Sequence, residues 1–336
     1  MWDMPGYSPS QLLEQKPLIV LTGPTAAGKT ALSIALAKRA GCEIISADSI
    51  QVYRHMDIGS AKISKEEMQG VPHYLIDEFM PDFEFNIYQF QKLAKQYVKQ
   101  IYEKGKIPLV VGGTGFYIQS LLYDIDFAPS DEADEQGGAH NPYRRELEEL
   151  AAKRGAKYLH HLLEEVDEES AKNIHANNIK RVIRALEYYR QTGEKISEHN
   201  KVQRQKTSPY RFAYFVLNHH RDILYKRIEQ RIDRMIEDGL VEEVAHLKEM
   251  GYDRNLVSMQ GLGYKEIYAY LEGECSLEEA VSVLKRDTRH FAKRQLTWFR
   301  RERDVIWMNY YDYLSLEDML KEMLQTLKDR EILQDI

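Results

Sequence analysis

The sequence predicts an α/β fold, a parallel sheet flanked by helices, with an inserted all-helical subdomain. Short apolar runs alternate with helical patterns in the first third of the chain, which is typical of βα units. The first run, Leu18–Leu21, leads directly into a Gly-rich turn and then into a helix pattern. A long stretch after about residue 124 has helical periodicity and no strand pattern, which predicts the insert.

Three strands are expected in the first part of the chain. After Leu18–Leu21, the run Glu43–Ser46 predicts a second strand that ends at Asp48. Ile107–Val111 predicts a third strand, closed by a Gly-Gly turn. Between them, Asn86 is a good cap for a helix that runs to about Lys104, because its side chain can accept a hydrogen bond from a backbone N–H of the first turn.

The second part of the chain is predicted to return to the sheet after the insert. The acidic, Gly-containing stretch Ser130–Asn141 is expected to be a loop, and Pro142–Ser197 to be successive helices. Tyr210–Leu217 predicts a returning strand. The later predictions are helices over Arg221–Asp238, Leu240–Met250, Gly263–Leu271, Ser276–Arg303 and Leu316–Leu327, and a strand over Val305–Met308. We therefore expect an extension over 1–16, a core of 17–123 with 209–336, and an insert over 124–208.

Composition and charge narrow the class of protein. No apolar run reaches the ~18–20 residues of a membrane span, and Met1–Lys16 lacks the pattern of a signal peptide. The two cysteines, Cys42 and Cys275, have no metal-type spacing, so a reducing, cytoplasmic setting is expected. The net charge of −7 disfavours a general nucleic-acid binder, but Lys285–Arg303 holds eight Lys or Arg against two acidic residues.

The strongest motif is a complete P-loop between the first strand and its helix. Its residues are Gly23, Pro24, Thr25, Ala26, Ala27, Gly28, Lys29 and Thr30. Glycines let successive N–H groups face an anion, the helix N-terminus adds positive potential, and Lys29 adds a full charge. The Thr30 hydroxyl can bind Mg²⁺. The core is thus P-loop NTPase-like, and the motif by itself indicates a phosphorylated ligand without identifying it.

Two further strand ends can carry chemistry. Asp48 is expected at the edge of the sheet where ligands of parallel sheets bind, and its carboxylate can orient a nucleophile or accept its proton. It could equally be a loop or helix cap. The third strand ends in Gly112-Gly113-Thr114, where NTPases commonly place an Asp, which weakens an NTPase interpretation. The turn is either a second phosphate cradle or a simple tight turn.

Two groups of cations have both a structural and a functional interpretation. Arg227 and Arg231 are four residues apart on one predicted helix face and could hold a diphosphate, or could form a solvated charged face with acidic neighbours. In Lys285–Arg303 the aromatic residues are expected in the core, and the cations could follow a phosphate backbone or simply face solvent.

Several segments together resemble one family. Beside the P-loop stand Ile45–Tyr53, Met56–Lys62, Val111–Tyr117, Gly261–Lys265 and Lys293–Arg300. From about Pro17 to Trp307 the chain is similar to bacterial tRNA dimethylallyltransferases, the IPP transferase family. The resemblance implies transfer of a dimethylallyl group from dimethylallyl diphosphate to N6 of adenosine 37, 3′ to the anticodon, in tRNAs that read codons beginning with U. It implies the anticodon stem-loop as partner and no zinc. We also expect Mg²⁺ as cofactor, no membrane association and a monomer.

The resemblance also assigns residues. It implies that the P-loop grips the donor diphosphate, that Asp48 is the base at the amine and that Thr114 assists near the leaving group. An arginine early in the insert matters in the family, and the match is open between Arg144 and Arg145, because Asp131–Asn141 departs from the family pattern. Segments matching tRNA contacts are Asp48, Ser49, Ile50 and Gln51; Lys180, Arg181 and Arg184; Gln260, Gly261, Gly263, Tyr264 and Lys265; and Lys293, Arg294, Gln295, Thr297, Trp298 and Arg300.

Two other functions compete with this one. A small-molecule kinase would use the same P-loop and Asp48, but the missing strand-end Asp and the basic C-terminal part disfavour it. An RNA-binding module without catalysis would not need a complete P-loop with Asp48 and Thr114 on the same sheet edge. In the favoured mechanism the target adenine is flipped out of its stack, and bases of the single-stranded anticodon loop are read.

Overall fold

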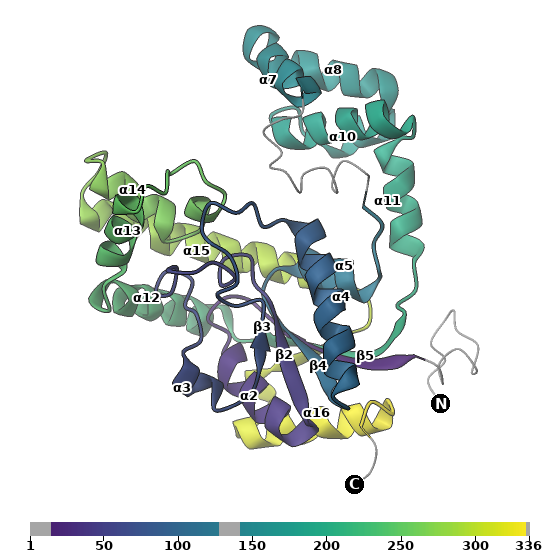
Figure 1. Ribbon diagram of the computed structural model, residues 1–336, viewed down its shortest axis with the longest axis vertical. Coiled ribbons are helices and arrows are strands. Elements are labelled where there is room, and N and C mark those ends of the chain that lie inside the picture. The colour runs from purple at the N-terminus through teal and green to yellow at the C-terminus, as the bar shows by residue number, and fades with distance from the viewer. Residues whose placement is uncertain (1–14, 128–141, 334–336) are drawn as a thin grey trace. The chain divides into compact units, whose positions relative to one another are not determined.

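The computed structural model describes residues 15–127 and 142–333 (Figure 1). The chain divides into two compact units, Tyr123–Ser208 and the remainder. The predicted loop Ser130–Asn141 and all but the last two residues of the predicted extension lie outside the described residues. Within the described ranges, no helix combines the length and the apolar character needed to cross a bilayer.

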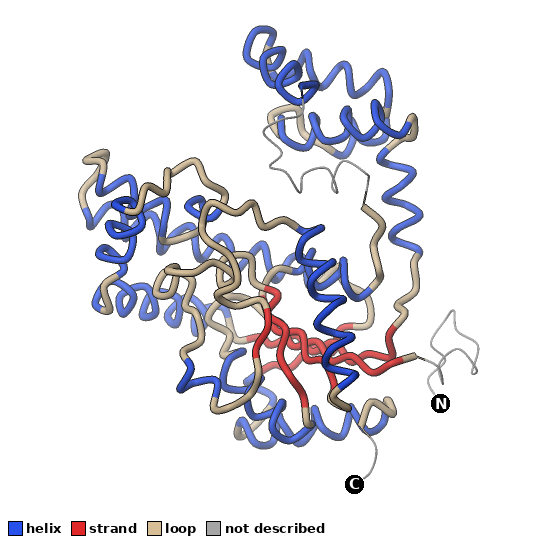
Figure 2. The backbone as a smooth tube through the Cα atoms, in the orientation of Figure 1, coloured by secondary structure: helices blue, strands red, loops and turns tan. Residues whose placement is uncertain are grey.

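The larger unit is built on a six-stranded, all-parallel sheet (Figure 2). Its order is β3-β2-β4-β1-β5-β6, so the P-loop strand lies inside the sheet. The strands are β1 (Lys16–Thr22), β2 (Cys42–Ala47), β3 (His73–Tyr74), β4 (Ile107–Gly112), β5 (Tyr210–Asn218) and β6 (Val305–Asn309). This confirms the predicted α/β class, and five of the six strands were predicted. The two-residue β3, paired with Ile44 and Ile45 of β2, was not.

Helices cover both faces of the sheet, so its central strands are apolar on both sides. Ile19 and Leu21 pack in one core cluster with α2 (Lys29–Ala40) and α16 (Leu316–Asp329), which lie together in Figure 1. Leu18 and Val20 are also buried. On β2 and β4 lie α4 (Ile87–Glu103) and α5 (Gly115–Leu122). As expected, the Asn86 side chain caps α4 by accepting from the Gln89 N–H at 3.0 Å.

A layer of helices follows β5 along the chain. It contains α12 (Arg221–Glu237), α13 (Leu240–Glu249), the short turn η3 (Ser258–Gln260), α14 (Tyr264–Leu271) and α15 (Leu277–Phe299). Two further short helices, α3 (Lys65–Met68) and η4 (Tyr310–Asp312), lie elsewhere in the chain. The prediction that the basic helix runs to Arg303 was wrong. Arg300 is its C-cap, and Asp304 takes a left-handed φ of 58° as the chain turns into β6.

The smaller unit is all-helical in its described part, as the sequence predicts. Its helices are α7 (Pro142–Arg154), α8 (Ala156–Val166), α9 (Glu168–Asn173), α10 (Ile179–Thr192) and α11 (Ile196–Gln205). They share a core that includes Leu147, Leu163, Val182 and Ile183. The buried Asp167 carboxylate accepts from the N–H and hydroxyl of both Ser170 and Ser197, at 2.7–3.0 Å. These four hydrogen bonds come from the same unit and offset the cost of burying the charge.

Candidate active site

The P-loop follows β1 and has the backbone that anion binding requires. Ala26 and Gly28 have left-handed φ values of 63° and 89°, and α2 begins directly after them at Lys29. Gly23 has φ of 152°, and a Cβ there would lie 2.7 Å from the Leu217 carbonyl oxygen of neighbouring β5. The sequence therefore folds into a tight cradle at the N-terminus of α2, where the backbone N–H groups of a helix start and the helix dipole favour an anion.

Three cations surround this cradle. The Lys29 ammonium donates to the carbonyls of Gly23 at 3.0 Å and Pro24 at 2.9 Å. Burial, and next the nearby positive charge of Arg231, lower the pKa of Lys29 to about 8, while the Asp48 carboxylate opposes the shift. The Arg227 guanidinium donates through Nε to the Ala26 carbonyl at 2.8 Å. Burial lowers the pKa of Arg231, and Asp48 again acts in the other direction. The structure thus brings both predicted arginines of α12 to the P-loop.

The turn after β4 is locked against the ends of its neighbours. A Cβ on Gly112 would lie 2.1 Å from the Ala47 carbonyl oxygen of β2, so only glycine fits. The Thr22 hydroxyl donates to the Gly112 carbonyl at 2.6 Å, and the Thr114 N–H donates to the Ala47 carbonyl at 3.1 Å. Thr114 therefore stands directly before α5, at the edge of the sheet that also carries the P-loop.

Gln295 joins the P-loop to this turn. Its Oε1 accepts from the Thr25 N–H at 2.9 Å, and its Nε2 donates to the Gly113 carbonyl at 2.9 Å. Its side chain is almost fully buried. The sequence predicted Gln295 as a tRNA contact of the basic helix, and the structure gives it two partners inside the protein. It connects α15 to the two turns that would hold the reacting groups.

Asp48 lies just beyond β2, between the cradle and the loop that follows. Its Oδ1 accepts from the N–H of Ile50 at 2.9 Å and of Gln51 at 3.3 Å. Its charge acts on Lys29 and Arg231, which places it beside the P-loop cations. The carboxylate is only partly buried, so it is both fixed by backbone donors and open to a ligand.

Two segments that match tRNA contacts meet at this edge. A Cβ on Gly261 would lie 3.1 Å from Cδ1 of Ile50, and Gly263 lies against Gly59. Tyr264 has no exposed surface, so its side chain acts on the neighbouring loop rather than on a ligand. Gln260 is exposed, as tRNA contact requires.

The basic helix α15 borders the turn that carries Thr114. The Trp298 ring packs against Gly115 so closely that a Cβ on residue 115 would lie 2.3 Å from ring atom Cδ1. The Nε1 atom of Trp298 is buried and has no hydrogen-bond partner among the described residues. Three of the helix cations are paired, Lys285 with Asp233, Arg286 with Asp287 and Arg289 with Glu229. The exposed members of the predicted tRNA contacts on this helix are Lys293, Arg294, Thr297 and Arg300. Among the described residues, Lys293, Arg294 and Arg300 form no salt bridge.

The candidates in the helical unit are placed only within that unit. Lys180, Arg181 and Arg184 are exposed on α10, opposite buried Val182 and Ile183, so the predicted amphipathic helix is confirmed. Arg144 forms a two-pronged ion pair with the buried Glu187, at 2.8 Å and 3.1 Å. Arg145 is exposed. Arg144 therefore has a structural role inside the unit.

Two aromatic contacts at the cradle were missed by the sequence analysis. The Tyr310 hydroxyl lies 2.7 Å from where a Cβ of Gly28 would be, and the Tyr310 ring stacks on His219 with centroids 4.0 Å apart. Burial lowers the pKa of His219. His219 follows β5 and Tyr310 follows β6. The one signal available was their position, because the carboxyl ends of parallel strands share one edge of the sheet.

Comparisons with known proteins agree with this geometry. The family model described as "IPP transferase" matches residues 51–302. A tRNA dimethylallyltransferase of Lachnoclostridium phytofermentans is 62% identical over 318 residues, 95% of this chain and 99% of the relative. One of Clostridioides difficile is 49% identical, over 94% of this chain and 99% of the relative.

Solved structures give the same result at the level of the fold. A full-length tRNA isopentenylpyrophosphate transferase of Bacillus halodurans is 40% identical with a TM-score of 0.68, and the match covers 95% of this chain and 98% of that one. A eukaryotic dimethylallyltransferase, solved acting on tRNA, is 26% identical with a TM-score of 0.79, covering 95% of this chain and 81% of that one.

Proposed function

The chain belongs to the IPP transferase family, and we propose that it transfers a dimethylallyl group from dimethylallyl diphosphate to N6 of a tRNA adenosine. The acceptor is adenosine 37, 3′ to the anticodon, in tRNAs that read codons beginning with U. The main support for this proposal is the set of groups that lie together at one edge of the sheet. There a cationic anion cradle, a carboxylate and a Gly-Gly-Thr turn stand together, and that turn has no strand-end Asp.

The cradle suits the diphosphate of the donor. Negative charge builds on the diphosphate as the C–O bond breaks, because the departing allylic carbon spreads positive charge over its double bond. The P-loop N–H groups, Lys29, Arg227 and Arg231 are fixed before the reaction and stabilise that charge. Preformed donors of this kind commonly supply the largest part of a rate enhancement.

The residues present fit Mg²⁺ bound together with the donor. The exposed Thr30 lies in the first turn of α2, beside the cradle, and Mg²⁺ in such sites keeps several waters and few protein ligands. Within the described residues, no group of three or more His, Cys, Asp or Glu side chains is placed so that it could hold a metal ion. Mg²⁺ would offset diphosphate charge when bound, with Thr30 as its protein ligand.

Asp48 suits the amine of the acceptor. N6 attacks C1 of the dimethylallyl group, the C1–O bond breaks, diphosphate leaves with the bonding pair, and the N6 proton passes to the Asp48 carboxylate. The two backbone donors hold Oδ1, which leaves Oδ2 for the amine. The adenine must leave its stack to reach this carboxylate. Arg294 and Arg300, exposed on α15, and the cations of α10 are candidates for phosphate contacts.

The family comparisons do not favour the small-molecule kinase considered above. Purified protein incubated with unmodified tRNA, dimethylallyl diphosphate and Mg²⁺, followed by digestion and mass analysis of the nucleosides, tests the proposal. N6-dimethylallyladenosine at the position 3′ to the anticodon is expected. Unmodified tRNA, together with ATP consumption in the presence of a metabolite acceptor, would contradict it. Light scattering on the same preparation tests the expected monomer.

A further inference from the structure

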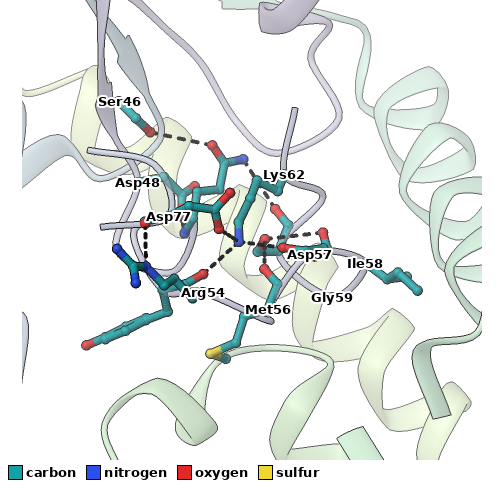
Figure 3. A network of polar contacts seen from close by, with 12 residues as sticks. Ser46, Asp48, Arg54, Met56, Asp57, Ile58, Gly59, Lys62 and Asp77 are labelled. Carbon is teal, nitrogen blue, oxygen red and sulfur yellow. Dashed lines mark hydrogen bonds and ion pairs between the residues drawn. The ribbon is translucent and has the colours of Figure 1, made fainter. Parts of the chain in front are cut away.

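The loop that follows β2 and begins at Asp48 is held in place by side-chain hydrogen bonds at both of its ends. This loop runs from Asp48 to Lys62 and contains turns but no helix or strand longer than one bridge. At its far end the Lys62 side chain is only 4% exposed, and it pairs with Asp57 and Asp77 and donates to the Tyr53 carbonyl (Figure 3). A buried ammonium with three oxygen partners fixes this end of the loop.

Glu243 of α13 binds the middle of the loop. Its Oε2 accepts from the N–H groups of Asp57 at 2.8 Å and Ile58 at 2.7 Å, and its Oε1 accepts from the Gly59 N–H at 3.0 Å. Three successive backbone N–H groups thus converge on one carboxylate, the arrangement that backbone nests use for anions. Charge-assisted bonds of this kind are about twice as strong as neutral ones.

Tyr264 of α14 completes the contact. Its hydroxyl donates to Glu243 Oε1 at 2.8 Å and accepts from the Ser60 N–H at 3.1 Å. A Cβ on Gly59 would lie 2.6 Å from the Tyr264 ring, so the ring fits only because residue 59 is glycine. Burial first, and then the charge of Glu243, raise the pKa of Tyr264, which keeps the hydroxyl a donor.

Gln51 connects this held segment to Asp48. Its Nε2 donates to the carbonyls of Ser60 at 3.3 Å and Ala61 at 3.2 Å. Its Oε1 accepts from the Ser46 hydroxyl at 3.5 Å, a contact visible in Figure 3. The backbone N–H of the same residue donates to Asp48 Oδ1. A continuous series of hydrogen bonds therefore runs from α13 and α14 to the carboxylate at the sheet edge.

We propose that Glu243 and Tyr264 are positioning residues for the transfer reaction, acting through the Asp57–Ala61 segment and Gln51 on the placement of Asp48. The proposal rests on the proposed function, since it assigns Asp48 as the proton acceptor at N6. Both side chains bind the loop on the acceptor side of the site. In the part of the chain that the structure describes, their hydrogen bonds join the Asp57–Ser60 segment and each other and do not reach the P-loop, so donor binding is expected not to depend on them. Loss of either side chain displaces the acceptor carboxylate and leaves the diphosphate cradle in place.

Steady-state kinetics with dimethylallyl diphosphate and unmodified tRNA test this assignment in the full chain. Glu243→Ala is expected to lower kcat by about 10²-fold, the usual effect of a small misplacement caused by a remote substitution. The KM for the donor stays at its wild-type value. Glu243→Gln keeps two lone pairs for the loop N–H groups and recovers part of kcat, and Tyr264→Phe loses less than Glu243→Ala. Glu242→Ala, the exposed neighbour on α13, is the matched control with wild-type kcat.

A double variant separates positioning from loss of fold. Because Glu243 and Gln51 lie on one path, Glu243→Ala combined with Gln51→Ala is expected to lose no more activity than the worse single variant. Additive losses, a rise in donor KM that accounts for the defect, or wild-type kcat in both Glu243→Ala and Tyr264→Phe would overturn the assignment. A thermal melting curve for each variant shows whether it is fully folded at the assay temperature, so that a lower kcat is not caused by unfolded protein. A wild-type enzyme that leaves tRNA unmodified would instead contradict the proposed function.

Discussion

Donor use should fall at alkaline pH because Lys29 loses its charge there. Burial and Arg231 lower the pKa of Lys29 to about 8 in the free protein, and only the ammonium form attracts the diphosphate. The charge is present below pH 8 and is lost above it. One unit above that pKa, about a tenth of the molecules keep the proton, so kcat/KM for dimethylallyl diphosphate should fall about tenfold between pH 7 and pH 9.

Few other groups should titrate in this window. Phosphate groups lose their last proton at about pH 6, so the charge of the donor diphosphate is nearly constant above pH 7. Burial raises the pKa of Glu302 to about 7, below the midpoint expected for Lys29. The assay is the initial rate of transfer to saturating tRNA, at donor concentrations far below KM, from pH 6.5 to 9.5. Because kcat/KM for the donor reports the enzyme form that has not yet bound the donor, its midpoint is expected at the Lys29 pKa.

The matched variant is Lys29→Arg. A guanidinium keeps its charge throughout this range, so the alkaline fall should disappear even if the variant is slower overall. A wild-type profile that is flat to pH 9.5, or a fall that persists unchanged in Lys29→Arg, would show that donor binding does not depend on the charge of this ammonium.

Three other predictions concern the acceptor, the RNA and the fold. Asp48→Asn keeps the two backbone hydrogen bonds and removes the base, so turnover should fall by ~10²–10⁴-fold with tRNA affinity unchanged; wild-type single-turnover rates would argue against the role. Replacing Arg294 and Arg300 by Gln should lower the slope of log K against log salt by about 0.7 for each lost contact to single-stranded phosphate, measured by titration at several salt concentrations; an unchanged slope would place the RNA elsewhere. Gly112→Ala should destabilise the fold by about 3 kcal/mol or more in urea unfolding, because its Cβ would overlap the Ala47 carbonyl at 2.1 Å; a stable variant would contradict the strand spacing.

Local sequence patterns were sufficient for five strands of the sheet and for the turn that the P-loop forms. Apolar runs buried on both faces, such as Leu18–Leu21, have no polar alternation and so mark interior parallel strands. The P-loop was found because its chemistry depends on neighbours in the chain. The two-residue β3 was not found, because His73 and Tyr74 form a strand only through pairing with β2.

Contacts between distant segments could not be predicted. Gln295 lies 270 residues after Thr25, and nothing in its own helix shows that its amide joins two turns of the sheet edge. Glu243 looks like any acidic residue early in a helix until the loop N–H groups are placed against it. The end of α15 was predicted too late, because the basic residues after Arg300 continue the composition of the helix while the backbone turns at Asp304.

In the proposed reaction the anion cradle makes diphosphate leave, so that carbon and not phosphorus is transferred to the tRNA. The most direct measurement uses dimethylallyl diphosphate labelled with ¹⁴C in the alkyl group and ³²P in the diphosphate. We expect one ¹⁴C-labelled alkyl group in the tRNA for each ³²P-labelled diphosphate released. Transfer of ³²P to tRNA, or release of diphosphate without ¹⁴C in the tRNA, would contradict it.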